Sequence, residues 1–173
     1  MQMRGLLIGA AIALVSGCDS GPDKMLDLLL CRETNLVVLR QQPVLLSGKL
    51  TTLTSQQTMK VIGESTFVCF VLRGDIPLQN NKAMDEAYGA VVHDAKIKVD
   101  AFLASGDRIS LHEPMMAWNM YGKVIKSNEL SACASALCGS GGLPIGSEVR
   151  RIEVSSDPSL LVQGIYWESG KSP

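Results

Sequence analysis

Short apolar runs separated by turn-forming residues dominate residues 35–73. The runs are NLVVLRQ, VLLSGKLTTLT, TMKVIG and STFVCFVLR, and the breaks between them contain Pro43, Gly48 and Gly63. Runs of this length that are rich in Val, Leu, Thr and Phe are typical of β-strands. The last run is almost wholly apolar, which predicts a central strand with Cys69 inside it.

A helical spacing follows in residues 80–107, NNKAMDEAYGAVVHDAKIKVDAFLASGD. Asn80 or Asn81 can cap its start and Gly106 can close its end. The segment therefore predicts one long amphipathic helix, and Pro22 favours a shorter helix over residues 22–32. The apolar positions of the long helix recur at intervals of three and four: Met84, Tyr88, Val91, Ala95, Val99 and Phe102.

Two strand-like runs, SEVRRIEV and LLVQGIYWES, lie near the C-terminal end and are joined by SSDPS. Asp157-Pro158 is a turn signal, so we expect a C-terminal β-hairpin. Taken together, the patterns predict a single α+β domain over residues 23–173, with an antiparallel sheet packed by the long helix.

The N-terminal segment has the layout of a signal peptide. Residues 1–17 carry one charged side chain, Arg4, followed by an apolar run from Leu6 to Val15 and the small residues Ser16 and Gly17. A helix that spans a bilayer needs about 20 apolar residues. The run is too short for that, so we expect the segment to be removed after export.

The end of this segment, Val15-Ser16-Gly17-Cys18, resembles the lipobox of bacterial lipoproteins. It departs from the commonest form in having Val15 where Leu is preferred. The resemblance covers residues 1–19 and implies cleavage before Cys18, attachment of diacylglycerol to its thiol, and anchoring by fatty acyl chains such as palmitate. Residues 18–22 would then be a lipidated cysteine and a short tether.

The resemblance also implies a location. Asp19 directly after the lipidated cysteine is associated with retention in the inner membrane, facing the periplasm. A plain secreted protein, in which Cys18 merely follows the cleavage region, is the alternative.

Charge and cysteine content agree with export. Removal of residues 1–17 leaves 156 of the 173 residues, with 15 basic and 17 acidic side chains, so we expect no nucleic acid partner. The cysteines other than Cys18 are even in number, as in a disulfide-bonded exported protein. They are Cys31, Cys69, Cys133 and Cys138.

The pairing of these four cysteines is open among three possibilities. A bond between Cys133 and Cys138 requires CASALCGSGG to leave helical geometry, because a spacing of five residues in a helix is beyond disulfide reach. Cys31 with Cys69 would then be the remaining pair. A metal site made by these cysteines is disfavoured, since no C-x-x-C pair exists.

Searching for catalytic motifs yields none of the familiar nucleophile, zinc or phosphate signatures. His93 and His112 are the only histidines. We expect no cofactor. The segment HEPMMAWNMYG could form a soft-metal site, but its methionines and aromatic residues are more typical of core packing. The candidate metal ligands would be His112, Met115, Met116 and Met120, and the candidate partner-binding aromatic residues are Trp118, Tyr121, Tyr166 and Trp167.

Three functions are consistent with the sequence. The first is a non-catalytic lipoprotein that binds another envelope protein as an accessory subunit, an inhibitor, or an immunity or exclusion factor. The second is a membrane-bound hydrolase that uses a histidine with a carboxylate. The third is a soft-metal carrier. The small size, the anchor and the missing catalytic motifs favour the first.

Overall fold

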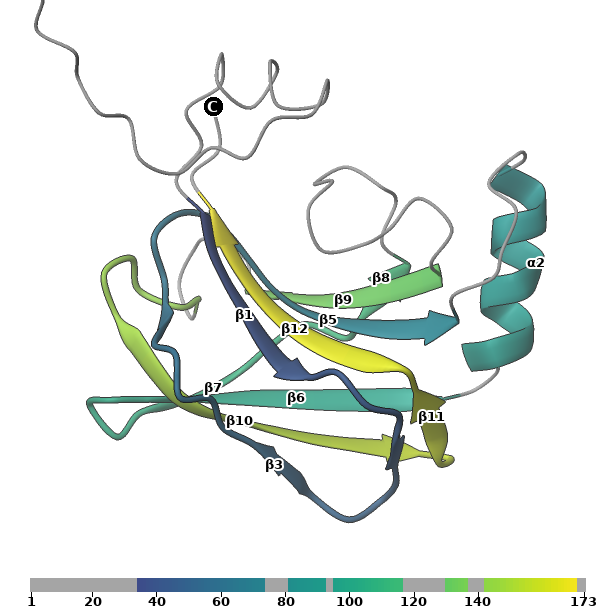
Figure 1. The fold of residues 1–173 in the computed structure, drawn as a ribbon, viewed down its shortest axis with the longest axis horizontal. Coiled ribbons are helices and arrows are strands. Elements are labelled where there is room, and N and C mark those ends of the chain that lie inside the picture. Colours follow the sequence, from purple (N-terminus) through teal and green to yellow (C-terminus); the bar gives the residue numbers. More distant parts are fainter. Residues whose placement is uncertain (1–33, 74–80, 93–94, 117–129, 137–141, 171–173) are drawn as a thin grey trace, which may run out of the picture. The chain divides into compact units, whose positions relative to one another are not determined.

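The computed structural model describes residues 34–73, 81–92, 95–116, 130–136 and 142–170. The chain divides into two units, residues 1–31 and residues 32–173, and every described residue belongs to the second. Strands make up most of the described part, and all their pairings are antiparallel (Figure 1).

The first of the two larger sheets, here called sheet 1, has β5 in its centre. Its order is β1-β12-β5-β9-β8. The almost wholly apolar run STFVCFVLR forms β5, as expected for a strand with a neighbour on each side. The strands of sheet 1 are β1 (Thr34–Arg40), β12 (Gly164–Gly170), β5 (Ser65–Arg73), β9 (Leu130–Ala136) and β8 (Met115–Met116).

The second larger sheet, here called sheet 2, has the order β3-β10-β6-β7, with β4 also paired to β10. A separate two-stranded sheet joins β2 (Val44–Leu46) to β11 (Leu160–Val162). The strands of sheet 2 are β3 (Thr51–Leu53), β10 (Glu148–Asp157), β6 (Lys96–Leu103), β7 (Arg108–Ser110) and β4 (Met59–Lys60).

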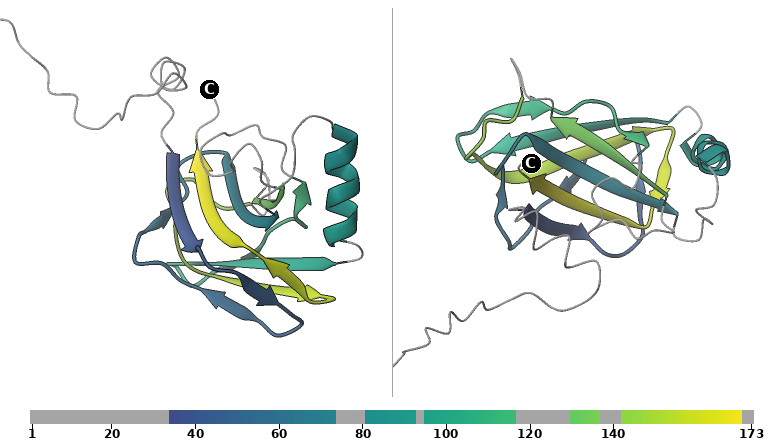
Figure 2. Two further views of the ribbon diagram at one scale, coloured as in Figure 1. Left: turned by 45° about the vertical axis from the view of Figure 1, so that its right-hand side comes forward. Right: turned by 90° about the horizontal axis from the view of Figure 1, so that it is seen from above.

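One hydrophobic core lies between sheets 1 and 2, which face each other in the left view of Figure 2. Trp167 and Phe70 from sheet 1 are its largest fully buried side chains, and Ile152 and Val154 from sheet 2 are also fully buried. Alternate residues of each strand point into this core, because successive side chains of a strand point to opposite faces. Each sheet therefore keeps a second face for other contacts.

Asn35 joins β1 of sheet 1 to β4 of sheet 2. Its Oδ1 accepts hydrogen bonds from the backbone N–H of Lys60 at 2.7 Å and from Nε1 of Trp167 at 3.0 Å, and its Nδ2 donates to the carbonyl of Thr58 at 3.2 Å. One amide side chain thus ties the two sheets and satisfies the indole of a buried tryptophan, which would be costly to bury without a partner.

The long helix predicted over residues 80–107 is wrong, and with it the α+β class. The structure has a 12-residue helix, α2 (Asn81–Val92), and then a strand, β6. Ile97, Val99, Ala101 and Leu103 are buried at every second position, which is a strand alternation. The same residues also fit a helical spacing. They form a strand because β6 pairs in antiparallel fashion with both β10 and β7.

The helix α2 contacts β9 and packs beside the ends of the strands rather than across a sheet (Figure 1). Ala87, Tyr88 and Val91 lie against the core, and the Tyr88 hydroxyl donates to the carbonyl of Pro114 at 3.4 Å. The shorter helix predicted over residues 22–32 lies outside the described residues.

The predicted C-terminal β-hairpin is also wrong. β10 pairs with β6 on one side and with β3 and β4 on the other, and β12 pairs with β1 and β5. Because both edges of each strand are occupied, β10 and β12 have no edge left for one another. The turn signal at Asp157-Pro158 is real, but it leads into β11, from which the chain passes to the other sheet.

Within the described residues, no helix combines the length and the apolar character needed to cross a bilayer.

Candidate functional site

The outer face of sheet 2 carries a cluster of charged and aromatic side chains. On β6 the core positions alternate with Asp100 and Phe102, which point to the other face. The register of the sheet places Glu153 opposite Asp100, and Arg151 opposite Phe102. It also brings β7 alongside, so neighbouring strands build one continuous surface.

Phe102 lies between two arginines that come from the strands on either side of it. The guanidinium carbon of Arg151 is 3.8 Å from the centroid of the Phe102 ring, and that of Arg108 is 5.9 Å from it. Both distances fall within the range of cation–π contacts. The half-buried ring therefore holds both guanidinium groups near the same point of the sheet.

Each arginine is also held by a carboxylate. Arg108 donates from Nη2 to Asp100 at 2.7 Å, and the Ser110 hydroxyl donates to the other oxygen of Asp100 at 2.6 Å. Arg151 donates from Nε to Glu153 at 3.0 Å. We refer to Arg108, Arg151, Phe102, Asp100 and Glu153 as the arginine cluster.

The environment of Asp100 favours its charged form. Burial alone raises the pKa of the Asp100 carboxyl, but the hydrogen bonds from Arg108 and Ser110, with the charges of Arg108 and Lys98, outweigh it, so the pKa is lowered. The hydrogen bond to Asp100 correspondingly raises the pKa of Arg108. Both shifts favour the charged forms of Asp100 and Arg108.

The cluster is suited to binding rather than to proton transfer. A guanidinium has five N–H donors in a planar fork. Arg108 and Arg151 each use only one of them for the carboxylates described above. The Arg108 side chain is 61% exposed and that of Arg151 is 43% exposed, so further donors face solvent. Neither arginine can act as an acid or base near neutral pH.

Among the aromatic candidates, the structure separates Trp167 from Tyr166. Trp167 is fully buried and belongs to the core, so it is not available to a partner. Tyr166 is half-buried on the opposite face of β12, where Leu36 and Val38 of β1 are partly exposed. Trp118 and Tyr121 lie outside the described residues.

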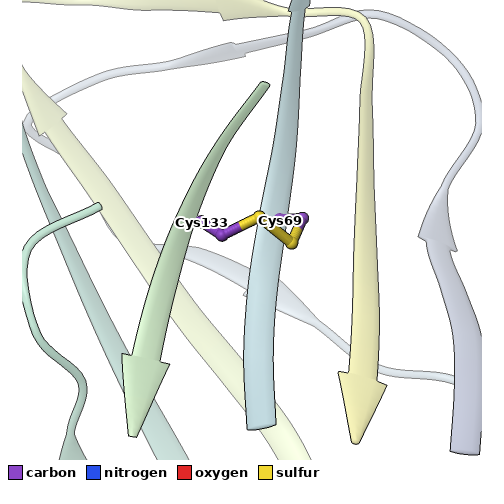
Figure 3. The surroundings of a disulfide bond; sticks show 2 residues. All are labelled: Cys69 and Cys133. Carbon is purple, nitrogen blue, oxygen red and sulfur yellow. A yellow bond between two sulfur atoms is a disulfide. The ribbon is translucent and has the colours of Figure 1, made fainter. Parts of the chain in front are cut away.

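Among the cysteines, Cys69 and Cys133 form a disulfide (Figure 3). They occupy directly opposite positions of β5 and β9, with their Cα atoms 4.1 Å apart. This pairing excludes the bond between Cys133 and Cys138, which the sequence left open. Cys31 and Cys138 lie outside the described residues, as do Cys18 and Asp19.

The proposed soft-metal residues lie around β8. His112 is exposed, and the Met115 side chain is 72% exposed. Met116 follows in β8, while Met120 and His93 lie outside the described residues. In the part of the chain that the structure describes, no group of three or more His, Cys, Asp or Glu side chains is placed to hold a metal ion.

Sequence reasoning missed the arginine cluster because it assigned Asp100 and Phe102 to a helix. A signal was nevertheless present. Read with a period of two, KIKVDAFL gives Lys, Lys, Asp and Phe on the face opposite Ile97, Val99, Ala101 and Leu103. This alternation would have placed Asp100 and Phe102 together on one outward face of a strand.

Comparison of the chain with protein-family models, curated proteins and solved structures finds no match.

Proposed function

We propose that this chain is an exported lipoprotein of the bacterial cell envelope that binds another protein at the periplasmic face of the inner membrane. It would be anchored by acyl chains on Cys18 and would act without catalysis, as an accessory subunit, an inhibitor, or an immunity or exclusion factor. The lipobox residues Val15-Ser16-Gly17-Cys18 and the sorting residue Asp19 support the location.

The disulfide between Cys69 and Cys133 is the observation that carries the proposal. Disulfides form and persist in oxidising compartments such as the bacterial periplasm, and they are rare in the cytosol. The two cysteines lie in neighbouring strands of sheet 1, so the bond requires the folded pairing of β5 with β9. A chain that forms such a bond is suited to export.

The features of the described surface favour binding over hydrolysis. The outer face of sheet 2 carries two ion pairs of arginine with carboxylate, and their guanidinium groups offer hydrogen-bond donors rather than an acid or base. His112, the histidine that the structure describes, is exposed on the surface. Catalytic acids and bases are found mainly in clefts that shift their pKa values.

Labelling with an alkyne analogue of palmitate tests the anchor. Expressed in a Gram-negative host, the wild type and Ser20→Ala should carry the label and fractionate with the inner membrane, while Cys18→Ser should lose both. Asp19→Ser should keep the label and move toward the outer membrane fraction. A wild type that carries no label and stays soluble would overturn the lipoprotein assignment.

Crosslinking in intact cells tests the binding role. One envelope protein should be recovered with the wild type in amounts that exceed those recovered with a lipidated but unrelated lipoprotein. Reproducible absence of any crosslinked partner from cells in which the wild type is labelled and correctly located would contradict the binding role, while leaving the anchor intact.

A further inference from the structure

The arginine cluster presents two guanidinium groups that are held in place before any ligand arrives. Arg151 is fixed by Glu153 and by the Phe102 ring, and Arg108 is fixed by Asp100. Ordering a long flexible side chain opposes binding, so arginines that are already ordered bind with less loss of entropy. Arginine and aromatic residues are also the side chains that dominate the binding energy of protein interfaces.

The charges around the cluster indicate what kind of ligand fits. Phe102 separates the two arginines, and Asp100 and Glu153 face each other in the next cross-strand row. Asp157 lies opposite Lys96 farther along the same pair of strands. Membrane surfaces and nucleic acids recruit clusters of basic residues without intervening acids. Alternating charge instead suits a ligand that places individual carboxylates against individual guanidinium groups.

Spacing favours an extended acidic peptide. Arg151 and Arg108 stand on strands that flank β6, and both reach the ring of Phe102. Alternate side chains of an extended peptide are about 7 Å apart and point the same way. Two glutamates or aspartates at such positions can therefore contact the two guanidinium groups together, each through the planar fork that matches a carboxylate.

We propose that Arg108 and Arg151, on either side of Phe102, form a binding site for paired carboxylates of an extended acidic segment of a protein partner. The inference rests on the proposed binding function and names the chemistry of the segment that is bound. Asp100 and Glu153 act as positioning residues, since they hold the guanidinium groups and do not contact the ligand.

Fluorescence anisotropy with a defined probe tests this site. The mature, lipidated protein in detergent is titrated into a labelled peptide in which glutamates alternate with threonines, and into the same peptide with glutamines. The glutamate peptide should bind at least roughly tenfold more tightly, as expected for hydrogen bonds to charged groups. Its affinity should fall with added salt.

The variants separate the site from general electrostatics. Arg108→Gln and Arg151→Gln should each weaken binding by roughly tenfold. Arg108→Lys and Arg151→Lys keep the charge and should weaken binding nearly as much, because lysine lacks the planar fork. Arg150→Gln removes the same charge one residue away on β10 and should change the affinity by less than about twofold. Circular dichroism must show a native spectrum for every variant.

Several results would overturn the site. These are equal binding of the glutamate and glutamine peptides, no binding of either, or losses with Arg150→Gln as large as those with Arg108→Gln and Arg151→Gln. The inference is also wrong, although the proposed function stands, if the partner crosslinked to the wild type is recovered equally with the double variant Arg108→Gln/Arg151→Gln. Failure to crosslink any partner contradicts the proposed function instead.

Discussion

At the scale of single residues, Asp100 is a charged residue on the outer face of a strand and is nevertheless nearly buried. Its side chain is only 10% exposed, and it keeps its charge because Arg108 and Ser110 bind its two oxygens. Asn35 plays a comparable part between the sheets, where one amide satisfies Trp167 and the backbone of β4. The partners of Asp100 lie on the adjacent strand β7, whereas those of Asn35 are distant in sequence.

Because the pKa of Asp100 is lowered in the folded state, its contribution to stability depends on pH. That contribution is present above the unfolded pKa, about 3.9, and is lost as the pH falls through the lower folded value. At pH 7, Asp100→Asn should reduce the free energy of unfolding by about 1 kcal/mol, a value for hydrogen bonds to a charged group weakened by solvent.

Urea unfolding of the wild type and Asp100→Asn between pH 2 and 7 measures this effect. The difference between the two proteins should be constant above about pH 5 and should shrink below about pH 4. Asp85→Asn, at an exposed position of α2, is the matched control and should change stability by less than about 0.5 kcal/mol. A difference that grows as the pH falls would contradict a lowered pKa.

At the scale of elements, the strand runs could be predicted but their partners could not. STFVCFVLR and NLVVLRQ correspond to β5 and β1, because apolar composition and turn residues are local signals. Pairing is set by contacts distant in sequence, so the sequence could not place β12 between β1 and β5. For the same reason, the arginine cluster could not be assembled from Phe102, Arg108 and Arg151 before the register was known.

The segment that became β6 shows why the helix prediction failed. Both a period of 3.6 and a period of two fit residues 95–103, since most of its positions are apolar or long charged side chains. Hydrogen bonding to β10 over most of its length decides in favour of a strand. Propensity is a weak preference beside a full set of strand pairings and a buried face.

The disulfide should stabilise the pairing of the two elements that it joins. It links residues 64 positions apart, and a crosslink of that span lowers the entropy of the unfolded chain by an amount worth roughly 4 kcal/mol. The double variant Cys69→Ala/Cys133→Ala should lose about 2 to 4 kcal/mol of unfolding free energy. Peptide mapping without reductant should recover the two cysteine-containing segments as one linked peptide.

A matched pair of variants makes this test specific. Reductant should lower the urea concentration at the midpoint of unfolding for the wild type. The part of this decrease that comes from the Cys69–Cys133 bond should be absent from Cys69→Ala/Cys133→Ala. Cys31→Ala/Cys138→Ala keeps the linked peptide and reports any contribution from the other two cysteines. A mapped peptide that joins Cys133 to Cys138 would contradict the disulfide described here.

At the scale of the whole molecule, the described residues share one core although they form two larger sheets. Trp167 and Phe70 from sheet 1 pack in the same cluster as Ile152 and Val154 from sheet 2. Neither sheet has a second core of its own in the described part of the chain, so separating them would expose the largest apolar side chains of both. A sheet with one apolar face needs a partner to be stable in water.

The described body should therefore unfold in a single cooperative transition. Trp118→Phe leaves Trp167 as the only tryptophan and makes its fluorescence a reporter of the core. Urea unfolding followed by this fluorescence should coincide with unfolding followed by far-ultraviolet circular dichroism, which reports both sheets. Ser20→Ala, outside the described residues, is the control for an unperturbed transition. Fluorescence that changes at lower urea than the circular dichroism would mean that the sheets separate before they unfold, and that the core between them is not the main source of stability.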